Sequence, residues 1–324
     1  MAHEPDLGVP SPTMRWAQAP GTPLTQGQAG LALVETDDAH TLLGFGGMPL
    51  SASQVWSFSL ATDSWAEVRI AAASPHARTG HCATFLPMSR QVLFVGGHDD
   101  HGNVSPAAMA LAVSTSTFTQ MQDGPPPESG CVAAYLPKLQ RAIVLDTNGQ
   151  TWSFDGQQFG TLTPSRAPSA RHDATMVYDP AHGDTASGRL LLFGGATATS
   201  ESAELWAFDG TTWAELGTKG DPAAADTDEP RPLSRARAAM ALNASRRLLY
   251  LFGGVRMGVF LNDAWRLDLR SNTWEKLAPG PGPVGRADAS VAYDAGRDRL
   301  LVFGGTAARG SLSDGWALTA TSTP

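Results

Sequence analysis

Three side chains in this sequence are of types that transfer protons. His81 carries an imidazole, and Asp173 and Asp288 are carboxylates that could act as acid and base. Arg171 and Arg286 each precede one of these aspartates by two residues. In an extended strand, each arginine would therefore point to the same side of the strand as its aspartate. A neighbouring guanidinium lowers the pKa of a carboxyl group, which suits a base better than an acid. The alternative is that these groups form ion pairs that tie parts of the fold together.

A second group of polar side chains could hold a metal ion. The stretch GHDDHG at 97–102 concentrates imidazole and carboxylate groups, which are ligands that suit zinc, iron or manganese. His98, Asp99 and His101 are the candidate ligands, and the expected cofactor is either none or one divalent metal ion. The alternative is a solvated turn, because no two-His-one-carboxylate spacing falls on one rigid element.

The composition limits the classes of partner. The chain has 324 residues and a formal net charge of −8, and it has no basic run that would match the phosphate backbone of nucleic acid. Its start, MAHEPDLGVP, lacks the pattern of a signal peptide, and its longest apolar runs have the length of strands. We therefore expect a cytoplasmic protein with a small-molecule ligand and with neither nucleic acid nor membrane as a partner. A protein partner is left open.

The chain contains two cysteines, Cys82 and Cys131. Two cysteines cannot form a disulfide framework, so both are expected to be thiols. Cys131 could be a nucleophile if a base stood beside it, or a small buried residue that fills space. Cys82 is expected to pack in the core.

The elements that must position these side chains follow from a repeat. The stretch LLLFGG at 190–195 returns as LLGFGG, VLFVGG, LYLFGG and LLVFGG, and in degenerate form as AIVLDT, at intervals of 48 to 59 residues. A period near 50 residues is typical of β-propeller repeats. Alternating apolar residues and a high β-branched and aromatic content predict four strands in each repeat and no helix.

Tryptophans mark the third and fourth strands of the repeats. The pairs are Trp56 with Trp65, Trp206 with Trp213 and Trp265 with Trp274, while Met109 with Phe118 and Trp152 with Phe159 take these places in repeats 2 and 3. The last repeat has only Trp316, and its missing partner is Trp16, in a lone strand near the start. Pairing of the two ends would remove an exposed sheet edge. The sequence therefore predicts an all-β fold, a six-bladed β-propeller of four-stranded blades in which the N-terminal strand completes the last blade.

The predicted boundaries follow from the spacing of the repeats. Residues 1–12 are a loose tail, 13–19 are the closure strand, and the blades span 27–70, 77–122, 128–163, 169–216, 235–277 and 284–319. These residues form one domain, 13–319.

The repeats resemble those of the Kelch repeat family. That family has an R-x-x-H-like start, an apolar strand that ends in Gly-Gly, and then a Tyr or Trp and a second Trp at fixed spacing; the resemblance covers residues 13–319. It implies a fold of the galactose oxidase and Kelch-type superfamily. It leaves the activity open, because such relatives include galactose oxidase, sialate mutarotase, nitrile-specifier proteins and ubiquitin ligase adaptors.

Kelch topology implies that the start of each inner strand and the loop after each Gly-Gly surround one mouth of the central channel. Counting back from the ends of the inner strands gives six ring residues, Gly30, His81, Cys131, Asp173, Arg237 and Asp288. Just upstream lie Arg78, Glu128, Arg171, Arg235 and Arg286. We expect the arginines, Glu128 and Cys131 to contact a ligand, while His81, Asp173 and Asp288 transfer protons. The alternative for His81 is the inter-blade hydrogen bond that is usual for the Kelch histidine.

The predicted function is binding of an anionic or polar small molecule at this mouth, with proton transfer of the isomerase, cyclase or lyase type. No phosphate-binding or dinucleotide-binding motif is present, so no organic cofactor is expected. One alternative is a protein-interaction scaffold without catalysis, and another is a metal-dependent lyase that resembles the nitrile-specifier proteins. The insertion at 217–235 would be either a lid over the mouth or a tolerated surface insertion.

Overall fold

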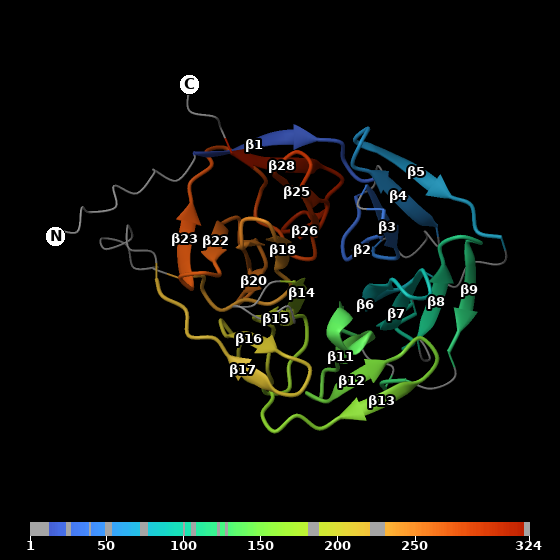
Figure 1. Ribbon diagram of the computed structural model, residues 1–324. Coiled ribbons are helices and arrows are strands. Elements are labelled where there is room, and N and C mark those ends of the chain that lie inside the picture. Colours follow the sequence, from blue (N-terminus) through green and yellow to red (C-terminus); the bar gives the residue numbers. More distant parts are fainter. Residues whose placement is uncertain are drawn as a thin grey trace, which may run out of the picture.

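The fold is a ring of six four-stranded antiparallel sheets (Figure 1). The structure is a computed structural model, and it describes residues 13–23, 27–38, 40–48, 54–71, 77–99, 101–104, 108–121, 124–126, 129–180, 188–220 and 231–320. Within these ranges the helical content is one short 3₁₀ turn, Pro137–Leu139, so the predicted all-β, six-bladed propeller is confirmed. No helix in the described ranges is long and apolar enough to span a membrane.

Each blade runs from an inner strand beside the channel to an outer strand at the rim. Blade 1 contains β2 (Ala32–Glu35), β3 (Thr41–Phe45), β4 (Val55–Ser59) and β5 (Ser64–Val68); blade 2 contains β6 (Thr79–Leu86), β7 (Gln91–His98), β8 (Met109–Ala112) and β9 (Thr117–Gln120). Blade 3 contains β10 (Val132–Leu136), β11 (Arg141–Leu145), β12 (Thr151–Phe154) and β13 (Phe159–Leu162); blade 4 contains β14 (Thr175–Asp179), β15 (Arg189–Phe193), β16 (Leu205–Phe208) and β17 (Trp213–Glu215). Blade 5 contains β18 (Ala239–Asn243), β19 (Leu248–Phe252), β22 (Ala264–Asp268) and β23 (Thr273–Leu277), and blade 6 contains β24 (Ser290–Asp294), β25 (Arg299–Phe303), β28 (Gly315–Ala320) and β1 (Met14–Ala19).

Two short hairpins extend from the blades just after the Gly-Gly pairs. They are β20 (Val255–Arg256) with β21 (Val259–Phe260) on blade 5, and β26 (Thr306–Ala307) with β27 (Gly310–Ser311) on blade 6.

The ring is closed by pairing of the two ends of the described chain. Strand β1 runs antiparallel to β28, with Trp16 opposite Leu318 and Gln18 opposite Trp316. Figure 1 shows the blue β1 beside the red β28 at the outer edge of the last blade. The Trp16 ring also packs on Phe252 of blade 5, with centroids 5.2 Å apart. The predicted closure is therefore confirmed.

The core lies between neighbouring blades. In one cluster, Leu191 and Phe193 of blade 4 pack with Leu251, Trp265 and Trp274 of blade 5. Both tryptophans of this blade are at most 1% exposed. Burial of such large apolar surfaces between sheets accounts for much of the cohesion of the ring.

The Gly-Gly pairs bring each blade close to the next. Gly194 and Gly253 have φ angles of +69° and +63°. A Cβ atom at either position would lie 2.5 Å from a backbone carbonyl oxygen of the following blade. Only glycine combines this left-handed backbone with so close an approach.

The inner edges of blades 2 and 3 are joined covalently. Cys82 in β6 and Cys131 just before β10 form a disulfide, with their Cα atoms 5.6 Å apart. The prediction of two thiols is therefore wrong, and so is the prediction that Cys131 acts as a nucleophile. Its predicted ligand contact stays a prediction, because Cys131 lines a cavity at the channel mouth. The two positions are 49 residues apart, almost one repeat, so the ring brings them side by side. A count of cysteines could not show this proximity.

Candidate functional site

A ring of backbone hydrogen bonds surrounds one mouth of the channel. Its members are Gly30, Gly80, Gly130, Asp173, Arg237 and Asp288, one from each blade, and all have left-handed φ angles between +53° and +94°. Five N–H groups donate to the carbonyl of the preceding blade over 2.7 to 3.0 Å, as Arg237 does to Asp173 and Asp288 does to Arg237. The same bond between neighbouring blades and the same left-handed backbone recur at these residues, so we take these six as the ring positions.

This ring corrects the predicted register in blades 2 and 3. His81 and Cys131 were expected at ring positions, but the residues there are Gly80 and Gly130. The prediction counted back from strand ends, and the inner strands differ in length. The ring therefore has a glycine half, in blades 1 to 3, and a charged half, in blades 4 to 6.

The ring borders a cavity of about 580 Å³, which we call the ring cavity. All six ring residues line it, together with residues such as Thr79, His98, Ser129, Thr175 and Thr306. A volume of this size is typical of sites for small molecules. Its walls are mostly backbone and small side chains, so the charged half supplies most of its chemical character.

Arg237 and Asp288 form a two-armed ion pair in the charged half. Arg237 Nε lies 2.8 Å from Asp288 Oδ1, and its terminal nitrogen contacts Oδ2. Asp173 adds a second carboxylate to the charge around Arg237. The hydrogen bonds and the charge of Asp288 raise the pKa of the Arg237 guanidinium, so this group stays protonated.

Asp288 does not have the surroundings that the sequence predicts. Burial raises the pKa of its carboxyl group, the Asp173 charge adds to the rise, and Arg237 offsets it only in part. Arg286, which was expected to lower this pKa, faces Asp314 instead.

Asp173 is paired with its neighbour His172. The imidazole Nδ1 lies 2.9 Å from Asp173 Oδ2, and the two side chains are 50% and 31% exposed. A carboxylate that orients an imidazole through Nδ1 leaves Nε2 to exchange a proton. No such role was predicted for His172, although the adjacent His-Asp pair is visible in the sequence.

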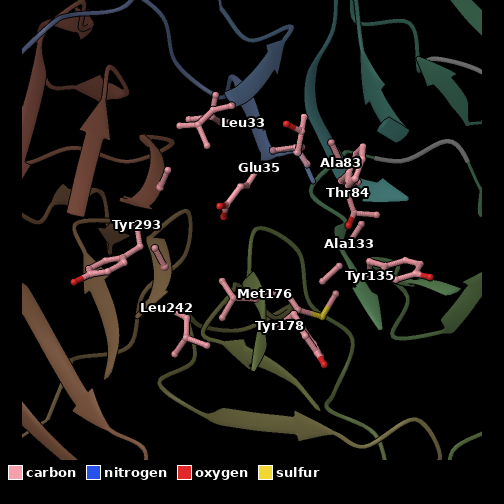
Figure 2. Close-up of a pocket in the computed structure, with 18 of the residues that line it drawn as sticks. Leu33, Glu35, Ala83, Thr84, Ala133, Tyr135, Met176, Tyr178, Leu242 and Tyr293 are labelled. Carbon is pink, nitrogen blue, oxygen red and sulfur yellow. The ribbon is translucent and has the colours of Figure 1, made fainter. Parts of the chain in front are cut away.

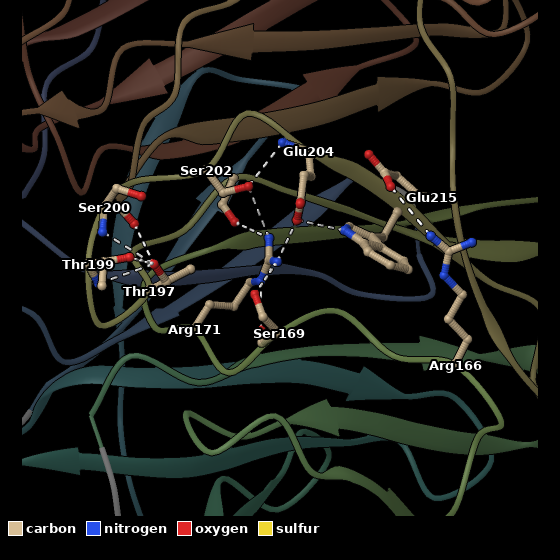
Figure 3. A network of polar contacts seen from close by, with 11 residues as sticks. Arg166, Ser169, Arg171, Thr197, Thr199, Ser200, Ser202, Glu204 and Glu215 are labelled. Carbon is tan, nitrogen blue, oxygen red and sulfur yellow. Dashed lines mark hydrogen bonds and ion pairs between the residues drawn. The ribbon is translucent and has the colours of Figure 1, made fainter.

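The upstream arginines have a structural role, as Arg171 shows (Figure 3). Its guanidinium is 1% exposed and binds Glu204 Oε2 over 2.6 Å and the Gly194 carbonyl over 3.0 Å. Glu204 also accepts a bond from Trp206 Nε1 over 3.0 Å. Figure 3 shows Ser169 and Ser202 completing the shell around this arginine.

The same arrangement recurs in blades 5 and 6. Arg235 binds both oxygens of Asp263, at 2.6 and 2.8 Å, and Asp263 accepts from Trp265. Arg286 binds both oxygens of Asp314 over the same distances. Arg171, Arg235 and Arg286 are therefore fully engaged within their blades, and the prediction that they contact a ligand is wrong.

Blade 2 keeps the arginine without the carboxylate. Arg78 is buried and donates to the Gly96 carbonyl over 3.2 Å, and burial lowers its pKa to about 10. The position that supplies Glu204 in blade 4 is Ala107 in blade 2. In blade 1, Gln28 replaces the arginine and donates to Gly46 over 3.0 Å. Arg78 is not among the residues that line the ring cavity.

His81 packs between aromatic rings. Its centroid lies 5.9 Å from that of Phe45 and 5.8 Å from that of Phe94. Burial and then the Arg78 charge lower the pKa of His81 to about 3, and the carbonyls of Phe45 and Arg78 oppose this only weakly. Within the described ranges, neither ring nitrogen has a partner at hydrogen-bond geometry. His81 is therefore neutral at physiological pH, and its contact between blades is aromatic packing.

The candidate metal ligands belong to a turn beside the ring cavity. Asp99 Oδ1 accepts from the backbone N–H groups of His101 and Asn103, and Asp99 Oδ2 accepts from the Asn103 side chain. His98 lines the cavity, with Nδ1 3.3 Å from Ser129 Oγ. In the described part of the chain, no three His, Cys, Asp or Glu side chains gather closely enough to hold a metal ion.

Two further expectations concern residues outside the described ranges. Glu128 is one of them, so its predicted ligand contact stays a prediction. Most of the insertion at 217–235 also lies there, since the description stops at 220 and resumes at 231.

The opposite end of the channel was overlooked. The same inner strands end around a second cavity of about 520 Å³, lined by Tyr135, Tyr178, Tyr293 and Glu35 among others. We call it the tyrosine cavity. This cavity was not predicted, because the ring residues were derived for one of the two mouths only.

Comparison with known proteins agrees with this architecture. The profile of the Attractin/LZTR1 beta-propeller family matches residues 137–315. The chain is 27% identical to Kelch domain-containing protein 3 of Bos taurus over 313 residues, which are 91% of this chain and 67% of that protein; the human form is 26% identical over the same shares. It is also 34% identical over 175 residues to Acyl-CoA-binding domain-containing protein 4 of Arabidopsis thaliana, half of this chain and 23% of that protein.

Proposed function

The chain belongs to the Attractin/LZTR1 family of Kelch-type β-propellers, and from this premise we propose that its ring cavity binds a small polar molecule. One observation carries the proposal: Asp173, Arg237 and Asp288 occupy left-handed ring positions where the other three blades have glycine. A left-handed backbone costs a residue with a Cβ atom about 1 kcal/mol. Three such charged residues around one cavity are therefore better explained by a ligand than by the fold.

The charge of the cavity indicates the class of ligand. The sequence favoured an anionic or polar molecule, on the assumption that several arginines reach the mouth. Arg237 is the ring cation, and it faces two carboxylates. We therefore infer a neutral polyhydroxylated or cationic ligand, because carboxylate oxygens accept hydrogen bonds from hydroxyl and ammonium groups.

We extend the proposal to proton transfer of the isomerase, cyclase or lyase type. His172 and Asp173 form the exposed pair that would take a proton from the ligand, and the Asp288 carboxylate, held by Arg237, would accept a hydrogen bond from it. Asp173 and Asp288 both line the ring cavity at its charged half, so they would reach neighbouring atoms of one bound molecule.

A protein-interaction scaffold is the second candidate function. Met257 and Val259, in the β20–β21 hairpin, are 78% and 62% exposed, and Met48 follows the first Gly-Gly with 42% exposure. Exposed apolar side chains at loops that follow Gly-Gly pairs are typical of a contact surface. The metal-dependent lyase remains a prediction that elemental analysis of the purified protein tests.

A cytoplasmic location also remains a prediction. Disulfides persist mainly in oxidising compartments. The bond between Cys82 and Cys131 is therefore an argument against it.

Equilibrium dialysis against a defined mixture of polar metabolites tests the proposed function. The mixture contains matched sets such as glucose, glucosamine and glucuronate, and mass spectrometry measures what the protein retains. We expect retention of neutral or cationic members, reduced at least about tenfold by Asp173→Gly. Ser116→Gly is the control, because Ser116 has a left-handed φ of +52° in a turn that does not line the ring cavity. Equal retention by wild type and Asp173→Gly, or no retention, contradicts the proposal.

A further inference from the structure

The tyrosine cavity differs in character from the ring cavity. Its volume is about 520 Å³, and apolar side chains such as Leu33, Met176 and Leu242 form much of its wall (Figure 2). Inner strands from all six blades contribute to this lining. The cavity is therefore large enough for an organic molecule and offers it apolar surface.

One charged side chain points into this apolar space. Figure 2 shows the Glu35 carboxylate directed toward the middle of the cavity. In the part of the chain that the structure describes, no hydrogen bond or ion pair holds this carboxylate. Burial, followed by the charges of Asp38 and Asp294, raises its pKa. Glu35 is nevertheless exposed at this mouth, so a cation that enters the cavity can reach its carboxylate.

Nearby arginines do not supply that charge. Arg90 pairs with Asp37 over 3.1 Å, and Arg299 pairs with Asp294 over 2.9 Å. Among the described residues that line the cavity, there is no Lys, Arg or His. The cavity therefore has an uncompensated negative charge and disfavours an anion.

The tyrosines present carbon rather than hydroxyl groups to the cavity. Figure 2 shows the hydroxyl ends of Tyr135, Tyr178 and Tyr293 directed away from its middle. The Tyr293 hydroxyl accepts from Asn243 over 2.7 Å and also contacts Asp298, which fixes its orientation. Aromatic rings at the edge of a site attract cations and apolar groups.

We propose that the tyrosine cavity binds an organic cation, an amine with an apolar body, through an ion pair with Glu35 and apolar contacts with Met176 and Leu242. This site is separate from the ring cavity and does not depend on the function proposed there. The ammonium group would sit at the Glu35 carboxylate, and the apolar body would cover the wall that Leu33, Met176 and Leu242 form.

Three probes of one shape but different charge test this proposal. They are 4-phenylbutylammonium, 4-phenylbutan-1-ol and 4-phenylbutyrate, each titrated into the full chain at pH 7.5 by calorimetry. We expect the ammonium probe to bind at least about tenfold more tightly than the alcohol, a difference of about 1.4 kcal/mol, and the carboxylate to bind most weakly. Glu35→Gln should remove the preference for the ammonium probe while leaving binding of the alcohol unchanged.

Two control variants locate the site. Glu67→Gln removes the same charge from β5, the outer strand of the same blade, and should leave all three affinities unchanged. Asp173→Gly alters the ring cavity and should also leave them unchanged, which separates this site from the function proposed above.

A second variant in the cavity lining keeps the proposal testable if Glu35→Gln does not fold. Ala133→Leu adds bulk to the cavity wall and should weaken all three probes together. The proposal is overturned if the three probes bind equally or if the preference for the ammonium probe survives Glu35→Gln. It is also overturned if the ammonium probe does not bind at a concentration of about 10 mM.

Discussion

Arginine has two roles in this propeller, and its place in the repeat decides which. Two residues before the ring, Arg171, Arg235 and Arg286 are buried and bound to a carboxylate in their own blade. At the ring itself, Arg237 is 35% exposed at the mouth of a cavity. The same side chain thus holds a blade together at one position and faces a potential ligand at the other.

The first prediction concerns the buried ion pair of blade 5. Asp263→Asn leaves the fully buried Arg235 guanidinium without its counter-charge, and we expect a loss of about 3 kcal/mol in the free energy of unfolding, measured in urea. Glu215→Gln breaks the exposed pair with Arg166, at 3.5 Å, and should cost less than about 1 kcal/mol. Equal losses in the two variants would contradict a structural role of the buried arginine.

The second prediction concerns the pH dependence of the same pair. Burial alone would raise the pKa of the Asp263 carboxyl, but the hydrogen bonds and charge of Arg235 and the bond from Trp265 hold it below its ordinary value of 3.8. A lowered pKa in the folded state stabilises the protein above pH 3.8, and this contribution is lost as pH falls through the folded pKa. The stability difference between wild type and Asp263→Asn should therefore shrink below pH 3.8. A constant difference from pH 7 to pH 2.5 would rule this out.

Part of the residue-scale picture could be predicted from the sequence. The acidic-x-Trp patterns of Glu204, Asp263 and Asp314 occur in the three blades that also have the arginine two residues before a charged ring residue. The ion pairs within these blades were therefore predictable from the sequence. The place of Glu35 in a cavity and the burial of His81 could not be predicted, because both depend on how neighbouring blades pack.

At the scale of elements, strands were predictable and their exact register was not. The Gly-Gly strands and the tryptophan strands lie where the repeat places them, since their period and apolar alternation are local properties. The ring residues of blades 2 and 3 were predicted one position too late. Backbone bonds between blades fix that register, and a single sequence does not show them.

The disulfide between β6 and the start of β10 provides the third prediction. Cys82→Ser combined with Cys131→Ser should lower the free energy of unfolding by about 3 kcal/mol, because the bond closes a long loop. When the protein is unfolded without reductant, a thiol reagent should not modify it, and mass spectrometry would show this. Modification of both cysteines in the unreduced protein would mean that the bond does not form.

At the scale of the whole molecule, closure of the ring was the strongest prediction and is confirmed. It rested on the orphan Trp16 and the unpaired Trp316, whose strands β1 and β28 now lie side by side. Four of the six predicted ring residues also hold: Gly30, Asp173, Arg237 and Asp288. The second mouth was missed because the resemblance to Kelch repeats directed attention to one face.

The fourth prediction tests this closure. A chain that begins at residue 21 lacks β1 and exposes the backbone of β28 as an open sheet edge. We expect lower stability and self-association, measured by urea denaturation and by light scattering after size-exclusion chromatography. A synthetic peptide of residues 13–20 should restore both properties, and failure of the truncated chain to differ from wild type would refute closure by β1.

Our proposal is that the charged half of the ring serves a ligand and not the fold, and the free energy of unfolding of Asp173→Gly tests this most directly. Glycine keeps both backbone bonds of the ring and relieves the left-handed strain, so we predict a value within about 1 kcal/mol of wild type. A loss of about 3 kcal/mol, as for the buried pairs, would contradict it, because Asp173 would then hold the blades together.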